Sequence, residues 1–312
     1  MPDGKSFRTG LDSGWVRHCA ERFVQLRRAG DGCQRSAPWL HCHGGLVKRM
    51  QLVSLHDKRD IEPFLRQNLF THLFEFSDLD DQYWPYTIWF GLKDGGDLRQ
   101  VALLYTGLPT PVLLANADRP CEMMSDLVQR IVPLLPRRVY AHMHPTHVDA
   151  IADHFSVMPR GLFYRMGLLN TSRIWDMDTS RVEGLSESDI PALEALYRVS
   201  YPDNSFRPQC VKTGWYYGIR HGSTIISVAG VHVCAPAYKV VALGNVTTHP
   251  RLRGRGLSRA ACARLCQSLM HHGVEHIGLS VKTDNASAIA CYTRLGFEKI
   301  VEHGAYMLEW KR

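Results

Sequence analysis

The sequence of 312 residues lacks any closely paired cysteine motif. Its nine cysteines are scattered, and no two of them are separated by just two residues. Disulfide-stapled domains and zinc ribbons need even or closely spaced cysteines, so neither is predicted and we expect reduced thiols. Leu40-His41-Cys42-His43 contains potential ligands, but no well-spaced partner cluster flanks it. We therefore predict no metal site.

Long apolar runs are also missing. No stretch approaches the roughly 18 apolar residues that a membrane span needs, and residues 1–49 lack the apolar core of a signal peptide. The sequence therefore predicts a cytoplasmic protein without a membrane partner.

The net charge of +7 is unevenly distributed. Residues 1–49 hold nine Lys/Arg and four Asp/Glu, which gives +5 and leaves +2 for the remainder. No stacking-aromatic or helix-turn-helix pattern accompanies this basic extension, so nucleic-acid binding is not predicted. We interpret residues 1–49 as a poorly ordered extension. Because Met50 directly precedes a strand-like run, a translation start at Met50 stays open.

The most informative segment joins a strand-like run to a helix-like run through two glycines and three arginines. Val240 to Thr248 is rich in strand formers, and Pro250 ends it. Downstream, apolar residues recur every four positions from Leu257, and Gly273 is a helix stop. A helix start leaves about four amides unpaired and favours anions, and glycines allow phosphate oxygens to approach. The alternative is a surface turn with solvated arginines.

Two other glycine-rich motifs are excluded. A dinucleotide fingerprint requires a third glycine where Arg259 stands, and a Walker loop requires Gly-Lys-Ser/Thr, which is absent. The loop is therefore of a different kind.

A second segment, Asn285 to Phe297, follows this loop. Asn285 and Tyr292 are seven residues apart and lie on one helix face, with Ala288 between them. We expect Thr283 or Asp284 to cap this helix, and His276–Val281 before it alternates as a strand should. The polar helix face is thus predicted to open at the end of a strand.

Together, Arg251-x-x-Gly254-x-Gly256 and Asn285-x-x-Ala288-x-x-x-Tyr292-x-x-x-Gly296-Phe297 resemble the GCN5-related N-acetyltransferase (GNAT) superfamily. A softer likeness points to its FR47 and glycine N-acyltransferase branch. The resemblance implies that acetyl-CoA is the co-substrate and that Tyr292 protonates the departing thiolate. It also implies a cofactor site that comprises Val246, Thr247, Thr248, Arg251, Arg253, Gly254, Arg255, Gly256, Leu257, Ser258, Asn285 and Tyr292.

Residues 50–172 repeat the order of elements predicted for 181–312. A helix is expected over about 57–76. Farther along, strand, helix (146–155) and strand over 139–166 match 276–308, and Ala150–His154 parallels Ala288–Tyr292 at an offset of 138. We expect an α/β fold of tandem GNAT-like units, each a mixed central sheet flanked by helices, with 170–180 as linker.

The first unit lacks a glycine where the phosphate loop belongs and has His154 in place of the tyrosine. We therefore interpret residues 50–172 as a degenerate domain and residues 181–312 as the catalytic one. Asp78 to Tyr86 is acidic and aromatic, and either lines an amine-binding site or is a packed loop.

Transfer of an acyl group to an amine also needs a base, and no glutamate stands on the strand 240–249. His249 is the leading candidate and His232 the second, and an amine of low pKa needs neither. We predict a coenzyme A-dependent N-acetyltransferase with a small amine or amino-acid-like acceptor. A longer acyl group, or a catalytically silent cofactor-binding module, remains the alternative. Two fused units are compatible with a monomer (a pseudo-dimer) or a homodimer.

Overall fold

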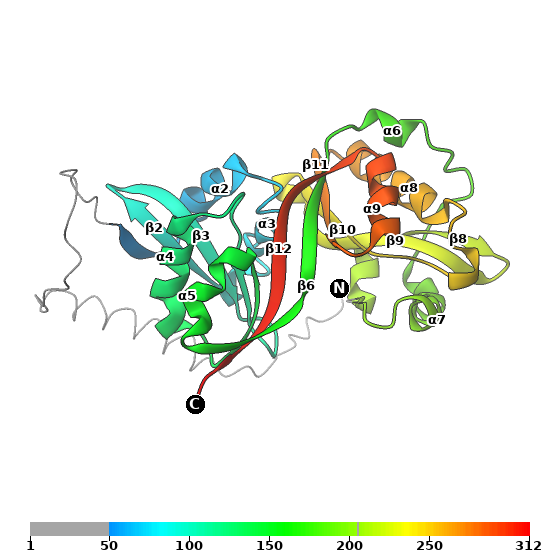
Figure 1. Cartoon of the computed structure of the whole chain (residues 1–312). Helices are drawn as coiled ribbons and strands as arrows, with labels where there is room; N and C mark the ends of the chain where they lie inside the picture. Colours follow the sequence, from blue (N-terminus) through cyan, green and yellow to red (C-terminus); the bar gives the residue numbers. More distant parts are fainter. Residues whose placement is uncertain (1–49, 205) are drawn as a thin grey trace, which may run out of the picture.

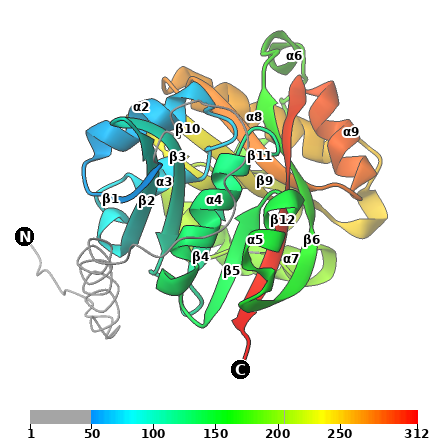
Figure 2. The same cartoon turned by 60° about the vertical axis from the view of Figure 1, so that its left-hand side comes forward.

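The computed structural model describes residues 50–204 and 206–312, and its strands join one sheet. The sheet has twelve strands in the order β1-β2-β3-β4-β5-β12-β6-β11-β10-β9-β8-β7. Figure 1 and Figure 2 show the long strands β6 and β12 through the middle of the molecule, with helices on both sides of them. The predicted basic extension and the Leu40–His43 segment lie outside the described residues.

The first lobe contains the first five strands and the helices that connect them. Its strands are β1 (Gln51–Leu55), β2 (Thr87–Asp94), β3 (Asp97–Tyr105), β4 (Val112–Ala115) and β5 (Arg138–Met143). Its helices are α2 (Lys58–Gln67), α3 (Glu75–Asp78), α4 (Glu122–Ile131) and α5 (Asp149–Ala152). Strands β1 to β4 are antiparallel neighbours, and β4 pairs with β5 in parallel.

The second lobe repeats this plan. Its strands are β7 (Glu183–Gly184), β8 (Tyr217–His221), β9 (Thr224–Ala235), β10 (Val240–Thr248) and β11 (His276–Lys282). Its helices are α6 (Ser172–Trp175), α7 (Ile190–Ser200), α8 (Leu257–His271) and α9 (Ala286–Arg294). Strands β7 to β10 are antiparallel neighbours, and β10 pairs with β11 in parallel. The predicted tandem α/β arrangement is therefore confirmed.

The last strand of each half is exchanged. Strand β6 (Phe155–Leu168) follows the first lobe in the sequence but pairs with β11, whereas β12 (Phe297–Trp310) pairs with β5. The two strands also pair antiparallel with each other, from Phe297 opposite Leu168 to Trp310 opposite Phe155. Each lobe is thus completed by a strand from the other half of the chain.

Three apolar clusters hold these layers together. Helix α4 buries Met124, Leu127 and Ile131 against the first lobe's strands, and α8 buries a corresponding stripe against the second lobe's strands. In the third cluster the segment from α2 to α3 packs on β3 and β4 and also on Val233 and Ala242 of the second lobe. This segment therefore fills the junction between the lobes.

Three local predictions are wrong. The helix expected over 57–76 is divided into α2 and α3, because the intervening chain turns from one lobe toward the other and buries Leu73 at the junction. Residues 146–155 form only the end of a short 3-10 helix and the four-residue α5, and Phe155 already begins β6. Helix α9 is capped by Asn285 itself, whose Oδ1 accepts a hydrogen bond from the Ala288 amide at 3.1 Å.

Candidate active site

The glycine loop lies between β10 and α8, as the sequence predicts. Gly254 and Gly256 have φ angles of 78° and 79°, which only glycine adopts without strain. The first intrahelical donor of α8 is the Ala260 amide, which bonds to the Gly256 carbonyl at 3.0 Å. The amides of residues 257–259 precede it, so this helix start carries the unpaired donors that bind phosphate oxygens.

The arginines of the loop differ in their contacts. Arg253 donates from Nε to the Thr248 carbonyl at 3.3 Å and from Nη2 to the Ser200 carbonyl at 3.0 Å. It therefore ties the loop to the end of α7. Arg251 and Arg255 are exposed, so their charges are accessible to an anion from solvent.

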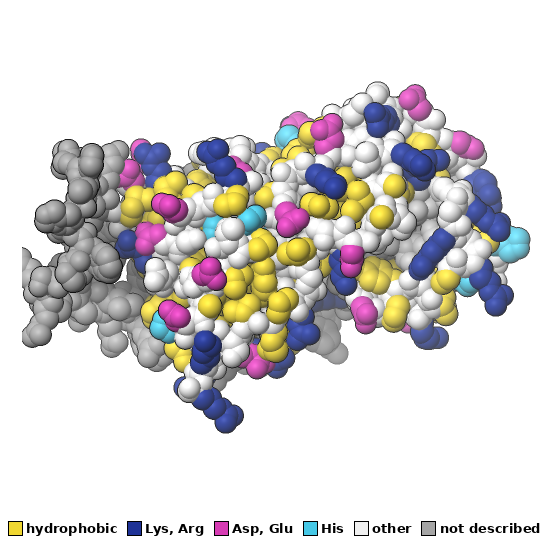
Figure 3. Space-filling view, in the orientation of Figure 1, with side chains coloured by type: hydrophobic (Ala, Val, Ile, Leu, Met, Phe, Trp, Pro, Cys, Tyr) yellow, Lys and Arg dark blue, Asp and Glu magenta, His cyan; other side chains and the backbone are white. Residues whose placement is uncertain are grey.

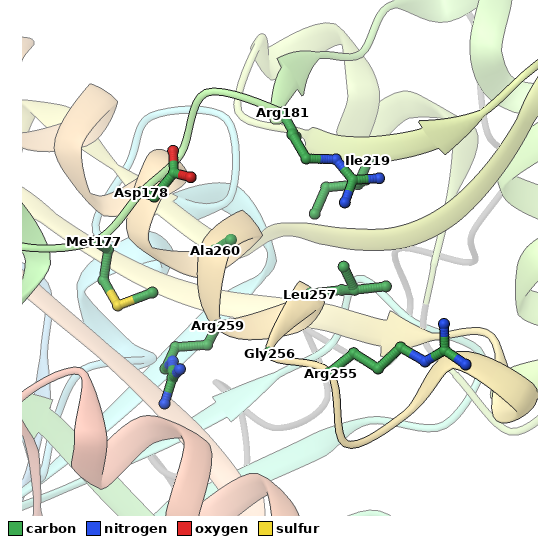
Figure 4. A pocket seen from close by; sticks show the side chains of 9 residues that line it. All are labelled: Met177, Asp178, Arg181, Ile219, Arg255, Gly256, Leu257, Arg259 and Ala260. Carbon is green, nitrogen blue, oxygen red and sulfur yellow. The ribbon is translucent and has the colours of Figure 1, made fainter.

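A hollow of about 180 Å³ adjoins the start of α8. Figure 4 shows Met177, Asp178 and Arg181, from the segment that precedes β7, around the hollow together with Gly256 and Arg259 of the loop and α8. Among the described residues, the buried Nε of Arg259 has no hydrogen-bond partner. Figure 3 shows further Lys and Arg side chains over the second-lobe end of the molecule. The surroundings of the loop therefore suit a polyanion.

Strands β10 and β11 separate just before this loop. Their parallel pairing runs only from Val240–His276 to Leu243–Leu279. The pairing of β10 with β9 is irregular between Gly244 and Thr247, and Asn245 there has a φ of 54°. We call this irregularity the bulge. Among the described strand pairings, the backbone of β10 after Leu243 therefore has no strand partner on its β11 side. An extended ligand can pair with this backbone as an added strand.

Two tyrosines hold the bulge. The Tyr197 hydroxyl donates to the backbone carbonyl of Asn245 at 2.7 Å. The side-chain Nδ2 of Asn245 donates to the Tyr216 hydroxyl at 2.9 Å. Burial raises the pKa of both phenols, which keeps them protonated. Our sequence reasoning missed these three residues, although Gly244-Asn245 inside a strand pattern is a signal for a bulge.

Helix α9 lies beside the start of α8, where the Ser258 hydroxyl approaches the Cys291 sulfur to 3.8 Å. Asn285 is exposed at the start of α9, and Tyr292, about two helical turns later, is only 8% exposed. The Tyr292 ring packs edge-on against Phe297 at 5.8 Å. The loop, the bulge and α9 thus surround the separated ends of β10 and β11.

The environment of Tyr292 is apolar. Burial, followed by the neighbouring thiols Cys262 and Cys291, raises the pKa of Tyr292 well above its usual value. The phenol is therefore fully protonated near neutral pH. Burial also raises the pKa of Cys291, which makes this thiol a poor nucleophile.

Gly296 supports the same corner of the site. A Cβ added there would lie 2.0 Å from the Asn170 carbonyl oxygen, and the Gly296 carbonyl accepts from the Leu169 and Asn170 amides. The glycine of the second sequence motif therefore lets the end of β6 pack on the end of α9.

The two candidate histidines occupy different ends of the site. His249 follows β10 and begins the phosphate loop, which places it about 13 Å along the strand from Asn245. His232 lies opposite Gly244, since a Cβ at Gly244 would approach the His232 Cβ to 2.4 Å. Burial, followed by the charge of Arg207, lowers the pKa of His232, so its imidazole is neutral at pH 7.

Within residues 50–204 and 206–312, no three or more His, Cys, Asp and Glu side chains come together as a metal site. In the same part of the chain, no helix combines the length and apolar character needed to cross a membrane.

The sequence model of the acetyltransferase (GNAT) family matches residues 183–297, from β7 to the first residue of β12. An uncharacterised protein of Mycobacterium leprae is 36% identical over 89 residues, which span 27% of this chain and 23% of that protein. The matched part is thus less than a quarter of that relative's length.

Two solved structures share the fold over most of the chain. A GNAT-family acetyltransferase from Novosphingobium aromaticivorans has 18% identity and a TM-score of 0.51, with 77% of this chain and 97% of that chain covered. A Drosophila protein has 10% identity and a TM-score of 0.59, with 82% and 98% covered. Residues 183–297 therefore match the acetyltransferase (GNAT) family, and most of the chain shares the fold of these two solved structures.

Proposed function

We propose that the protein is an acetyl-CoA-dependent N-acetyltransferase that acts on a small amine by direct transfer. The observation that carries this proposal is the separation of β10 from β11 at Leu243, beside an exposed helix start with two glycines. The gap offers backbone pairing to the pantetheine arm, and the amides at residues 257–259 and the exposed Arg255 suit the pyrophosphate. These features fit coenzyme A along its length.

Acetyl-CoA supplies an activated acyl group as a thioester. The amine nitrogen forms a bond to the acyl carbon, the carbon–sulfur bond breaks, the amine loses a proton and the sulfur gains one. Backbone amides near the bulge stabilise the charge that develops on the acyl oxygen. The raised pKa of Tyr292 fits a group that stays protonated until the thiolate leaves.

We assign the removal of the amine proton to His232, because it lies opposite Gly244, where the acyl end of the cofactor is expected. His249 lies at the phosphate end and remains the alternative base. Cys291 takes no part, since its thiol is held protonated by burial.

The experiment is a thiol-release assay with acetyl-CoA and a panel of amines, repeated with longer acyl-CoA esters. Amine-dependent release that is fastest with acetyl-CoA supports the proposal. Faster release with a longer ester would change the acyl donor. Binding of acetyl-CoA without release for any amine would identify a silent cofactor-binding protein instead.

A further inference from the structure

The hollow beside the start of α8 is separate from the gap that the pantetheine arm requires. None of the residues that line the hollow belongs to β10 or β11. Its volume is about 180 Å³, whereas a water molecule takes up roughly 30 Å³. The hollow therefore has room for a ligand group of its own.

The protein side of the hollow is apolar. Ile219 of β8 is 1% exposed, and Met177, Leu257 and Ala260 pack with it on the second lobe's apolar cluster. We call these four residues the apolar floor. A flat ring with apolar faces, such as a nucleobase, can cover a floor of this kind and remove it from water.

Three arginines surround this floor, and Figure 4 shows them around the hollow. Arg181 and Arg255 are exposed, and their side chains form neither a hydrogen bond nor a close ion pair with the other described residues. Arg259 lies against the helix start, because a Cβ added at Gly256 would be 3.5 Å from its Nη2. The buried Nε of Arg259 also has no hydrogen-bond partner among the described residues. These guanidinium groups are thus available to an anion.

Asp178 is the one acid in the lining of the hollow. Its carboxylate accepts a hydrogen bond from the Ser180 amide at 2.9 Å. This bond, and to a smaller extent the charge of Arg181, holds the pKa of Asp178 below its usual value. Because Asp178 is exposed, solvent screens its charge, and three guanidinium groups oppose it. The hollow therefore favours an anion with more than one negative charge.

Coenzyme A carries such a group next to its pyrophosphate. The ribose bears a 3′-phosphate monoester, and phosphate monoesters have a charge of about −1.5 to −2 at pH 7. In the proposed function the pyrophosphate binds the amides of residues 257–259. Gly256 and Leu257 also line the hollow, so the hollow begins where the pyrophosphate is expected to end. Guanidinium groups match phosphate oxygens in a bidentate geometry, and they stack on aromatic rings.

We propose that the hollow binds the 3′-phosphoadenosine end of coenzyme A, with the adenine on the apolar floor and the ribose 3′-phosphate on Arg181 and Arg259. This inference rests on the proposed function and adds the group by which the donor is selected. Thioesters of phosphopantetheine alone lack this end and gain nothing from Arg181. The segment before β7 then makes the enzyme selective for complete coenzyme A esters.

The test is a calorimetric titration of the full chain with acetyl-CoA and with acetyl-3′-dephospho-CoA, which differ only in the 3′-phosphate. We expect the Kd of the dephospho ester to be at least about tenfold higher, the scale of a charge-assisted contact. Arg181→Gln should raise the Kd of acetyl-CoA by a similar factor and leave that of the dephospho ester unchanged. Equal Kd values for the two esters with the wild-type chain would overturn the inference.

Arg119→Gln is the matched control, because Arg119 is exposed and lies in the first lobe's turn after β4. It removes the same charge far from the hollow, so both Kd values should stay within about twofold. If it weakens acetyl-CoA binding as much as Arg181→Gln does, attraction by net charge explains the preference and the inference fails. A circular-dichroism melt of Arg181→Gln should match the wild type, since this side chain is exposed and makes no hydrogen bond.

Three probes without an acyl group separate this inference from the proposed function: adenosine 3′,5′-bisphosphate, adenosine 5′-diphosphate and inorganic phosphate. Tighter binding of the 3′,5′-bisphosphate than of the 5′-diphosphate, lost in Arg181→Gln, supports the subsite even if no amine releases thiol. In that case only the proposed function fails. Inorganic phosphate that binds as tightly as the 3′,5′-bisphosphate would identify a general anion site and overturn the inference. No binding of the 3′,5′-bisphosphate would also overturn it, whether or not acyl transfer is observed.

Discussion

The two lobes share one strand order and differ at the turn after their fourth strand. In the second lobe this turn contains Gly254 and Gly256 and leads into α8, whose 15 residues end in a glycine stop at Gly273. In the first lobe, β4 is followed by buried Asn116, which donates to Glu75 at 3.0 Å, and α4 has only 10 residues. The same architecture thus has an exposed helix start in one lobe and a buried polar contact in the other.

The helices α9 and α5, which occupy corresponding positions in the two lobes, also differ in length and in the residues they present. Helix α9 has nine residues and presents Asn285 and Tyr292, whereas α5 has four and is followed by exposed His154, which stacks on Trp310 at 5.6 Å. The apolar clusters under α4 and α8 remain comparable. The comparison teaches that the fold depends on buried apolar positions, while the proposed cofactor site depends on a few residues that can be absent without loss of the fold.

The largest expected effect is that of substituting Tyr292, and His154 is the corresponding residue of the first lobe. If only the second lobe carries chemistry, Tyr292→Phe should lower kcat by about 10² to 10⁴-fold, because the thiolate loses its proton donor. The corresponding His154→Phe should leave kcat within about twofold. Initial rates of thiol release measure both. An unchanged rate for Tyr292→Phe would show that another group protonates the thiolate.

The base is tested by a second substitution. His232→Gln should lower kcat/KM about 10²-fold at pH 7, since the amine loses its proton acceptor. The wild-type rate should persist below pH 6.5 and decline only near the lowered pKa of His232, because the imidazole must be neutral to act. Exposed His221 provides the control as His221→Gln. If His249→Gln has the larger effect, the alternative base is correct.

The glycine loop is tested by charge. Gly256→Asp places a carboxylate and a strained φ at the expected phosphate site, so the Kd for acetyl-CoA should rise at least about tenfold. Gly222→Asp is matched, because Gly222 also has a positive φ of 59° and lies in an open hairpin turn. Calorimetric titration gives both constants. Equal affinities would mean that phosphate groups do not bind at this turn.

The smallest expected effect concerns the first lobe's polar interior. Burial lowers the pKa of His142 to about 3 and that of His303 well below its usual value. Below pH 6.5 the unfolded chain binds these protons and the folded chain does not, so stability falls as pH falls, by about 1.4 kcal/mol per pH unit for each group.

Burial alone would raise the pKa of Glu75, but His72 and Arg165 lower it to about 2. Its contribution to stability is therefore lost only below about pH 4.5, outside the range of this test. Urea unfolding at pH 7.5 and 5.5 should show a smaller difference for His142→Gln than for wild type. Exposed His154→Gln should behave as wild type. An unchanged difference for His142→Gln would contradict the assignment.

The sequence predicted those features that local patterns determine. The four-residue apolar repeat of α8, for example, is buried at Ala261, Leu265 and Leu269. Three kinds of feature could not be predicted from the sequence. The Asn245 bulge depends on tyrosines far away in the sequence, and Asn285 proved to be a cap because the turn before α9 ends one residue later than expected.

The strand exchange could not be predicted, because the alternation of buried and exposed side chains along β6 and β12 is the same whichever strand each one pairs with. Both strands bury apolar residues, such as Met166 in β6 and Leu308 in β12, and only the relative position of the lobes decides which edge each strand meets. The domain limits of 50–172 and 181–312 remain a prediction about the sequence, and in space each of these ranges lends its final strand to the other.

The exchange also affects how the chain is made. Strand β12 is synthesised some 150 residues after β5, yet it is the neighbour that covers the edge of β5. At synthesis rates of roughly 5–20 residues per second, that edge stays open for about 8 to 30 s. During this interval the nascent first lobe exposes a strand edge on which a neighbouring chain can pair. A ribosome-bound fragment that ends before Phe297 should therefore need chaperone protection that the finished protein does not.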